Sequence, residues 1–339
     1  IKTQLSSQGI KANSINGSLL NEPWSVLKKD ASPYKVFTPY HREASKIDPP
    51  ITLLPAPQLP TPLINDSHAS SLEGLTLLPT INWDSGLHKC WEPGEAGASL
   101  LLNNFLSNGI NDYKDGRDRP ALKAISRLSP HLHFGDISPH QIINALLTIP
   151  DDENSEHFKR EIRWREFSYY LLFHFPGLPN QNLKTNFNYF PWENNPAWLK
   201  CWQQGLTGYP LVDAGMRELW QTGYMHNRVR MVVASFLIKN LLVDWRLGAS
   251  WFWDCLVDAD LASNSASWQW VAGCGTDASP YFRVFNPIIQ GEKFDPQGEY
   301  TKLYVPELKA LPDKYLFRPW EAPPEVLNQA NITLGETYP

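Results

Sequence analysis

From about residue 92 to the end of the chain, apolar side chains recur at helical spacing, and no strand-helix alternation interrupts them. Ser138 and Pro139 have the residue types of an N-cap and a first helical turn, and the positions that follow supply an apolar face: Ile142, Ile143, Leu146 and Leu147. Further helices are predicted at about 155–173, before Gly223, at about 225–243 and at about 260–273. Without an internal repeat, the pattern favours one mainly α, all-helical domain over residues 92–339.

The first 91 residues differ from this domain. Residues 1–46 begin with a helix-like polar stretch, and Ser18–Leu20 and Tyr34–Tyr40 are interpreted as strand ends joined by turns. The stretch from Pro49 to Pro79 is rich in Pro, Leu and Ser and has no period, which is typical of a linker. We therefore expect residues 1–46 to be the end of a separate domain and residues 47–91 to connect it to the helical domain.

Composition narrows the classes of protein. The 339 residues are 42% hydrophobic and 19% charged, which excludes a disordered scaffold. The longest apolar stretch, 231–243, is interrupted by Lys239 and Asn240 and is shorter than the roughly 20 residues that span a bilayer, so no membrane partner is expected. A net charge of −5 argues against diffuse binding to polyanions but permits a local basic patch. The 14 tryptophans, 13 tyrosines and 15 phenylalanines indicate ring stacking or electron transfer.

Four widely spaced cysteines form neither a disulfide framework nor a C-x-x-C metal motif, and they suit a reducing compartment. His131 and His133 have no further ligand at metal-binding spacing, so no metal is predicted. Phosphate loops and nucleophile elbows of known form are absent from the sequence.

Three segments carry the candidate chemistry. On the helix predicted at 155–173, one face places a carboxylate among aromatic rings through Phe158, Glu161, Trp164 and Ser168. The alternative is that Glu161 simply pairs with a neighbouring arginine.

The helix predicted at 225–243 carries a polar and small-residue stripe among Val, Phe, Leu and Ile, namely His226, Asn227, Arg230, Met231 and Ala234. Such a stripe needs a polar partner inside the fold. An internal hydrogen-bond network without a ligand is the alternative.

The segment 258–270 is the third. Asp260, Asn264 and Trp268 share a helical face, whereas Trp270 points about 200° away from Trp268. Small residues between the two tryptophans would let a flat ligand or another helix approach, although a buried core with two tryptophans is the alternative. At residues 126–130 a helix start with hydroxyls and an arginine could hold phosphate, or it could be an ordinary capped helix.

Five motifs, taken in order, resemble the photolyase and cryptochrome family over about residues 92–310: 164–167 (WREF), 205–217 (GLTGYPLVDAGMR), 225–228 (MHNR), 258–270 and 275–278 (GTDA). Within the family the chain looks most like the bacterial, class I cyclobutane pyrimidine dimer photolyases. Residues 34–40 then resemble the end of the family's amino-terminal α/β antenna domain, most of which is absent. The antenna pigment, of folate or deazaflavin type, is not identified by the sequence.

The resemblance implies FAD in the helical domain. The residues that would bind it are Tyr113, Ser126, Arg127, Leu128, Ser129, Phe158, Arg230, Asp258, Asp260 and Asn264. Two positions depart from the family pattern, since Ile125 stands where relatives commonly have Thr and Phe158 stands where bacterial relatives often have Trp. Asn264 would lie near the flavin N5, and the tryptophans that match the family's electron-transfer chain are Trp268, Trp245 and Trp192.

The implied partner is DNA that contains a pyrimidine dimer, bound with the lesion flipped out of the duplex. Glu161 would act on the lesion, in a pocket formed with Trp164, Asn227, Met231 and Trp270, while phosphates would be gripped by Arg117, Arg228 and Arg283. The implied reaction is light-driven splitting of the dimer by an electron from reduced FAD, in a cytoplasmic bacterial monomer that associates with the nucleoid when bound to DNA.

Three alternatives remain open. A (6-4) photoproduct photolyase usually has two adjacent histidines where this chain has His226 and Asn227. A cryptochrome photoreceptor typically loses the lesion-stacking aromatics that are kept here as Trp164 and Trp270. A flavin-binding remnant without catalysis is the third.

Overall fold

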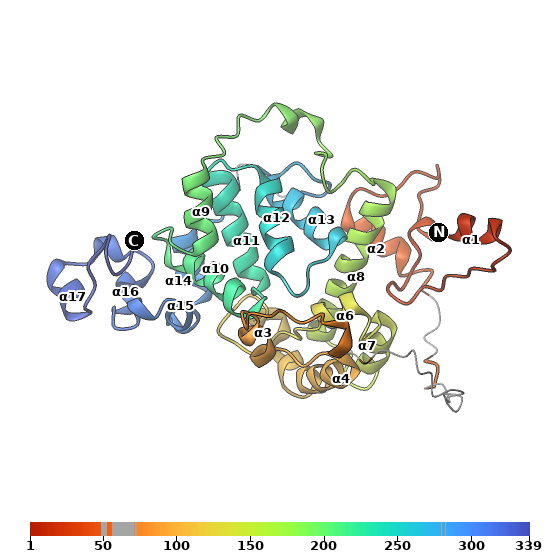
Figure 1. The fold of residues 1–339 in the computed structure, drawn as a ribbon, viewed down its shortest axis with the longest axis horizontal. Coiled ribbons are helices and arrows are strands. Elements are labelled where there is room, and N and C mark those ends of the chain that lie inside the picture. The colour runs from red at the N-terminus through yellow and green to blue at the C-terminus, as the bar shows by residue number, and fades with distance from the viewer. Residues whose placement is uncertain (49–52, 56–70, 72, 279, 282) are drawn as a thin grey trace.

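The computed structural model describes residues 1–48, 53–55, 71, 73–278, 280–281 and 283–339, so part of the predicted linker, including residues 56–70, lies outside the described residues. The described parts are mainly helical (Figure 1). Their α-helices are α1 (Lys2–Ser7), α2 (Phe37–Ala44), α3 (Ser85–Cys90), α4 (Gly94–Asn104), α5 (Tyr113–Gly116), α6 (Ser129–Phe134), α7 (Pro139–Leu146), α8 (Glu153–His174), α9 (Pro196–Gln204), α10 (Pro210–Thr222), α11 (Asn227–Ser235), α12 (Trp245–Cys255), α13 (Leu261–Ala272), α14 (Pro287–Phe294), α15 (Glu299–Tyr304), α16 (Asp313–Leu316) and α17 (Pro324–Gln329).

Helices α9 to α13 form the centre of the molecule, with α8 and α2 on one side and α14 to α17 extending on the other (Figure 1). The main core is built by buried side chains of α10 to α13, and it continues into the C-terminal helices. Gly248 of α12 permits the close approach of α13, since a Cβ there would lie 2.2 Å from the Trp268 ring. The mainly helical fold predicted from the sequence is therefore confirmed.

Helix α8 is the longest helix among the described residues and begins where its sequence provides a cap. The Asp152 carboxylate accepts a hydrogen bond from the Ser155 amide, and the Ser155 hydroxyl accepts one from the Asp152 amide. The helix packs against α13 and α2. It thus brings residues predicted to be functional next to the 258–270 segment.

The strand prediction for the first 46 residues is wrong. Phe37, Tyr40 and Ala44 form the buried face of helix α2, which packs on Phe167 and Tyr170 of α8. Their i, i+3, i+7 spacing is helical, and the short apolar run was misread as a strand. Leu20 and the residue after it make no strand ladder, because their backbone amides donate to a side chain of α8.

That side chain is Glu166, which is 2% exposed. Its carboxylate accepts hydrogen bonds from the amides of Leu20 and Asn21, the latter at 3.0 Å, and from the Tyr40 hydroxyl at 3.1 Å. Arg163 donates to Glu166 and also forms a two-pronged ion pair with Asp48 at 2.6 and 2.7 Å. This buried polar cluster fixes residues 18–48 on α8.

The helix predicted at 225–243 is shorter than expected. Helix α11 passes at Phe236 into a π turn that runs to Asn240, and Leu242 adopts a left-handed conformation with φ of 52°. Asp244 then caps α12 by accepting from the Arg246 amide. The chain therefore changes direction within residues 236–242, where the sequence predicted the last turns of the helix.

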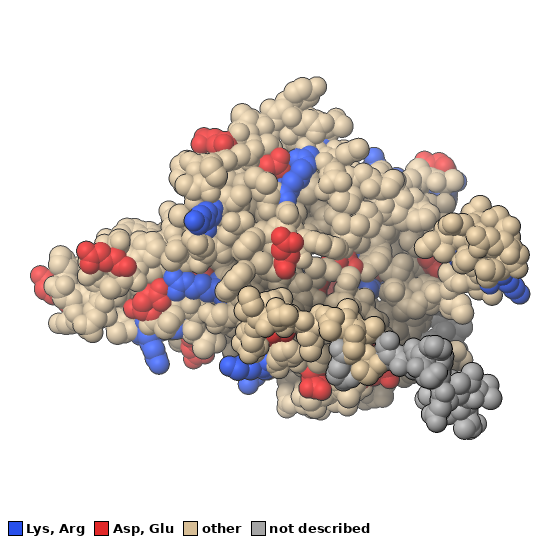
Figure 2. Space-filling view, in the orientation of Figure 1, with Lys and Arg blue, Asp and Glu red and all other residues tan. Residues whose placement is uncertain are grey.

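Charged residues of both signs are scattered over the face seen in Figure 2. Within the part of the chain that the structure describes, no helix combines the length and the apolar character needed to cross a bilayer.

Candidate functional site

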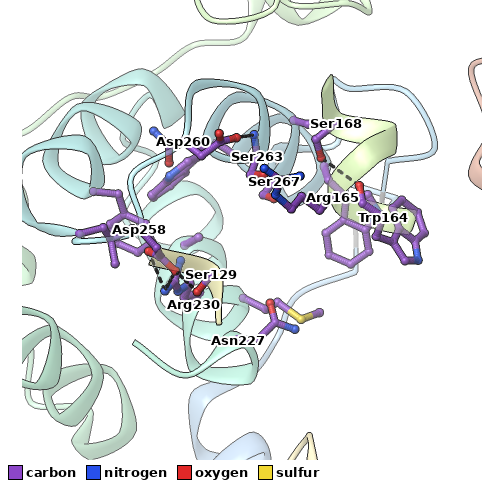
Figure 3. A pocket seen from close by; sticks show the side chains of 18 of the residues that line it. Ser129, Trp164, Arg165, Ser168, Asn227, Arg230, Asp258, Asp260, Ser263 and Ser267 are labelled. Atoms are coloured by element: carbon purple, nitrogen blue, oxygen red, sulfur yellow. Dashed lines mark hydrogen bonds and ion pairs between the residues drawn. The ribbon is translucent and has the colours of Figure 1, made fainter. Parts of the chain in front are cut away.

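A cavity of about 520 Å³ opens between α8, α11 and α13 (Figure 3). Its wall includes twelve of the residues predicted from the sequence. From the set expected to hold a cofactor these are Ser129, Arg230, Asp258, Asp260 and Asn264, and from the set expected to hold a substrate they are Arg117, Glu161, Trp164, Asn227, Met231 and Trp270. The twelfth is Trp268, which was expected to carry electrons. The fold therefore joins the two predicted sets in one cavity.

The cavity wall contains an ion pair between α11 and the segment before α13. Arg230 Nη2 donates to both carboxylate oxygens of Asp258, at 3.1 and 2.9 Å, and Ser129 Oγ donates to Asp258 Oδ2 at 2.6 Å. These side chains lie together in Figure 3. Asp258 thus has two side-chain donors, and Arg230 retains polar hydrogens for another partner.

Two further polar groups of the wall come from α13 and its cap. Asp260 Oδ1 accepts from the Ser263 amide at 2.7 Å, which is the N-cap bond of α13. Asn264 donates its side-chain amide to the Ala249 carbonyl at 3.0 Å, so this contact holds its side chain against α12.

The opposite wall is formed by α8. The Arg117 guanidinium donates to the Glu161 carboxylate, which is about one-third exposed, so the charge of Glu161 has a partner. The Trp164 ring stacks on Phe37 with centroids 3.8 Å apart, and α2 thereby supports one face of the tryptophan. Trp270 is half-buried on α13, with its ring 6.3 Å from that of Phe285.

Three residues expected to contact the cofactor lie in a hydrophobic cluster outside the cavity wall, namely Tyr113, Leu128 and Phe158. The rings of Tyr113 and Phe158 meet edge to face at 5.3 Å, and both are less than 7% exposed. Their positions support a packing role in this cluster.

Ser126 and Arg127 lie in the turn before α6. The Ser126 hydroxyl accepts weakly from the Leu128 amide, at 3.4 Å. Arg127 has a φ of 54°, and its guanidinium lies over Trp91 at 4.4 Å and over Tyr224 at 5.1 Å. Its buried Nε has no hydrogen-bond partner among the described residues, which leaves this cation able to take up an anion.

The three tryptophans expected to carry electrons differ in burial. Trp268 and Trp245 are 2% and 1% exposed, whereas Trp192 is half-buried, and its ring lies tilted against that of Phe190 with centroids 4.3 Å apart. Trp245 Nε1 donates to the Asn182 side chain at 2.9 Å. Trp268 and Trp245 belong to the main core cluster, and Trp192 packs against it.

Two arginines expected to bind phosphate lie outside the cavity wall. Arg228 is paired with Asp118 at 2.7 Å and stacks on Phe294 at 4.4 Å. Arg283 is exposed, with its guanidinium 5.6 Å from the Phe285 ring. Of the two, Arg283 is the more accessible cation.

Several residues of the wall were not identified from the sequence: His133, Arg165, Tyr224, Ser263, Ser267 and Thr276. Burial raises the pKa of the Tyr224 phenol to about 12, so it stays protonated. The buried hydroxyl of Thr276 has no hydrogen-bond partner among the described residues. Thr276 lies in the quoted 275–278 motif and could have been found there, whereas Tyr224 carries no such signal.

His131 and His133 each have an acidic partner, Asp136 at 2.8 Å and Asp260 at 3.3 Å. Within the described residues, no group of three or more His, Cys, Asp or Glu side chains could hold a metal ion.

Comparison with known proteins gives two family matches. Residues 158–339 match a family model described as the FAD binding domain of DNA photolyase, and residues 1–61 match one described as DNA photolyase. A deoxyribodipyrimidine photo-lyase of Agrobacterium fabrum is 48% identical over all of this chain, which spans 72% of that protein. Cryptochrome-2 of Arabidopsis thaliana is 38% identical, again over all of this chain, which spans 58% of it. A crystal structure of a class III photolyase from Agrobacterium tumefaciens superposes with a TM-score of 0.90 at 47% identity, covering 100% of this chain and 71% of that one.

The family match assigns FAD as the cofactor, and the cavity has the chemistry to hold it. Large aromatic rings and small residues of α13 suit flat ring systems, while Ser and Thr hydroxyls suit polar groups. The unpartnered hydroxyl of Thr276 is a buried polar atom of the cavity wall that a bound molecule could satisfy. The residues present therefore fit this cofactor.

Proposed function

Because this chain belongs to the photolyase and cryptochrome family, we propose that it repairs cyclobutane pyrimidine dimers in DNA under light. The observation that carries the proposal is that Asp258 and Asp260 line the same cavity as the aromatic rings of Trp164 and Trp270. A relative with 48% identity is named deoxyribodipyrimidine photo-lyase.

FAD bound in its reduced form would supply, on absorbing light, the electron that opens the dimer and would accept it back afterwards. The chain would hold the cofactor through Arg230, whose free donors are directed by Asp258, and through the Arg127 cation. Asn264 and Asp260 would line the edge of the flavin, where their fixed dipole and charge need no reorganisation.

On the substrate side the chain must stabilise two bases outside the duplex. Flipping them out costs a few kcal/mol, and stacking on an aromatic face recovers about 1 to 3 kcal/mol per base. Trp164, supported from behind by Phe37, and Trp270 would provide these faces. Glu161 would hydrogen-bond the lesion, with Arg117 holding its carboxylate at the cavity wall.

Arg283 would contact backbone phosphate, because it is exposed, whereas Arg228 would contribute less because Asp118 already pairs with it. DNA binding by a chain of net charge −5 would therefore depend on a small number of cations.

Within the family we propose membership of class III rather than the class I expected from the sequence. The support is the TM-score of 0.90 with a structure titled as a class III photolyase. The alternative function is that of a cryptochrome photoreceptor, which the 38% identity to cryptochrome-2 keeps open. A (6-4) photolyase is less favoured, because Asn227 occupies the second position of the expected histidine pair.

The test compares binding and repair of duplexes that carry a cyclobutane dimer, a (6-4) photoproduct or no lesion. The proposal expects preferential binding and light-dependent repair of the cyclobutane dimer. Trp270→Ala should lose about 5-fold to 150-fold in affinity for the dimer-bearing duplex and little for the undamaged one, since one stacking face is removed. Equal affinity of the wild-type protein for all three duplexes, with no repair in light, would favour the photoreceptor alternative.

A further inference from the structure

One oxygen of Asp260 has two side-chain partners from two different helices. The Tyr169 hydroxyl of α8 donates to Asp260 Oδ2, and His133 Nδ1 of α6 lies 3.3 Å from the same oxygen. The other oxygen is occupied by the N-cap bond from the Ser263 amide at 2.7 Å. The carboxylate is therefore fixed from α6, α8 and α13, with its side chain 11% exposed at the cavity wall.

The network extends one step further from the cavity. Arg165 lies over the Tyr169 ring at 4.8 Å, and its Nη2 is 3.4 Å from the Tyr169 hydroxyl oxygen. Arg165 is held in turn by the carbonyl oxygens of Ser18 at 2.6 Å and Leu132 at 3.2 Å. Among the described residues, the charged and titratable groups that face Asp260 are thus His133, Tyr169 and Arg165.

These contacts favour the ionised carboxylate. Burial alone would raise the pKa of Asp260, but the hydrogen bonds from the Tyr169 hydroxyl and the Ser263 amide outweigh it and lower that pKa. Burial and the neighbouring carboxylate raise the pKa of Tyr169 to about 12, so its hydroxyl keeps the proton that it donates. Because an ionised carboxylate can only accept, His133 must carry a hydrogen on Nδ1 for its contact to be a hydrogen bond.

We propose that Tyr169 and His133 are positioning residues, which hold Asp260 ionised and in one orientation so that its charge sets how readily FAD in the cavity is reduced. The inference rests on the proposed function only in placing the flavin beside Asp260. The negative charge of Asp260 opposes the addition of an electron to the flavin. The hydrogen bonds from Tyr169 and His133 offset part of that charge. Tyr169 does not line the cavity, so it acts through Asp260.

The first experiment measures the reduction potential of the bound flavin at pH 8. Tyr169→Phe removes a single oxygen atom. We expect this variant to bind reduced flavin about tenfold less tightly relative to oxidised flavin, which lowers the two-electron reduction potential by about 30 mV. The matched control is Tyr170→Phe, on the next residue of α8, whose hydroxyl bonds the Val26 carbonyl at 2.8 Å instead. It should leave the potential unchanged.

A double-mutant cycle distinguishes an effect of Tyr169 that acts through Asp260 from a general loosening of the cavity wall. In an Asp260→Asn background, Tyr169→Phe should no longer shift the potential, because the charge through which it acts is gone. His133→Leu should shift the potential in the same direction as Tyr169→Phe in the wild-type background. Equal shifts from Tyr169→Phe in both backgrounds, or none in either, would overturn the inference.

The second experiment needs no flavin. The Asp260 carboxyl carbon is titrated by NMR in the purified full chain and in Tyr169→Phe, where we expect the pKa of Asp260 to rise. An unchanged pKa would overturn the inference. Absence of FAD from the purified protein would instead refute the proposed function, while this titration would still decide the role of Tyr169.

Discussion

Arg230 reaches across from α11 to hold both oxygens of Asp258, at 3.1 and 2.9 Å, and only 4% of the Asp258 side chain is exposed. The pair joins a helix of the predicted polar stripe to the 258–270 segment. Among the described residues, Arg230 forms no ion pair with another acid, and Asp258 forms none with another base. The cavity wall therefore depends on this pair.

Removing one partner of the Arg230–Asp258 pair should lower the free energy of unfolding. Arg230→Ala leaves the Asp258 carboxylate with the Ser129 hydroxyl as its remaining side-chain donor, and breaking a buried pair in this way costs about 3 to 5 kcal/mol. We expect loss of bound FAD together with a lower free energy of unfolding, measured by flavin content and urea denaturation. The double variant Arg230→Met, Asp258→Asn should recover part of the stability without the cofactor. A single variant as stable as the wild type would contradict the structural role of the pair.

Glu166 should control the docking of residues 18–48. Glu166→Ala removes the acceptor of two backbone amides and of the Tyr40 hydroxyl, and each donor left unsatisfied costs about 1 to 3 kcal/mol. We expect faster proteolysis within residues 18–48 and a lower unfolding midpoint. Glu153→Ala, which removes an exposed partner of Lys114, is the matched control and should change neither. Identical proteolysis of both variants would refute the docking role.

His226 should make stability depend on pH. Burial lowers the pKa of His226 to about 4, and nearby arginines act in the same direction. Between pH 4 and about 6.5 the unfolded chain then binds a proton that the folded chain does not, so stability falls as pH falls, by at most about 1.4 kcal/mol per pH unit. His226→Asn should flatten this slope in urea unfolding at pH 4.5, 5.5 and 6.5. An equal slope in both proteins would show that other groups dominate.

Trp268 should be required for photoreduction of oxidised FAD but not for repair by chemically reduced protein. It lines the cavity and belongs to the core cluster that also contains Trp245. Trp268→Phe keeps an aromatic ring of lower electron-donating ability, so light in the presence of an external reductant should reduce the flavin much more slowly. Trp198→Phe, at a 42% exposed position on α9, is the control. A normal rate of photoreduction in Trp268→Phe would place the electron path elsewhere.

Local sequence signals predicted several of the helices, and the resemblance to the family supplied the roles of the predicted cavity residues. The capping residue Ser138 and the small-residue segment 258–270 were readable, because each acts within a few positions of itself. Helix α2 was missed, since its apolar face spans only eight residues and becomes recognisable as helical when it packs on α8.

Contacts between distant segments could not be read from one sequence. Tyr169 and His133 meet Asp260 across 91 and 127 positions, and Asp118 neutralises Arg228 across more than 100. The same limitation affected Phe158, whose spacing suggested the face of Glu161 but whose ring packs with Phe105 and Tyr113. Side-chain partners set by the fold decide which residues of a face reach the cavity.

If the cavity supports light-driven repair, the electron that opens each dimer should return to FAD. The most direct test counts the dimers split per protein-bound FAD under blue light, using chemically reduced protein, a duplex with one cyclobutane dimer and no further reductant. We expect many dimers split per FAD, none in darkness, and an unchanged flavin absorption spectrum afterwards. Absence of splitting in light, or one oxidised FAD for each dimer split, would contradict it.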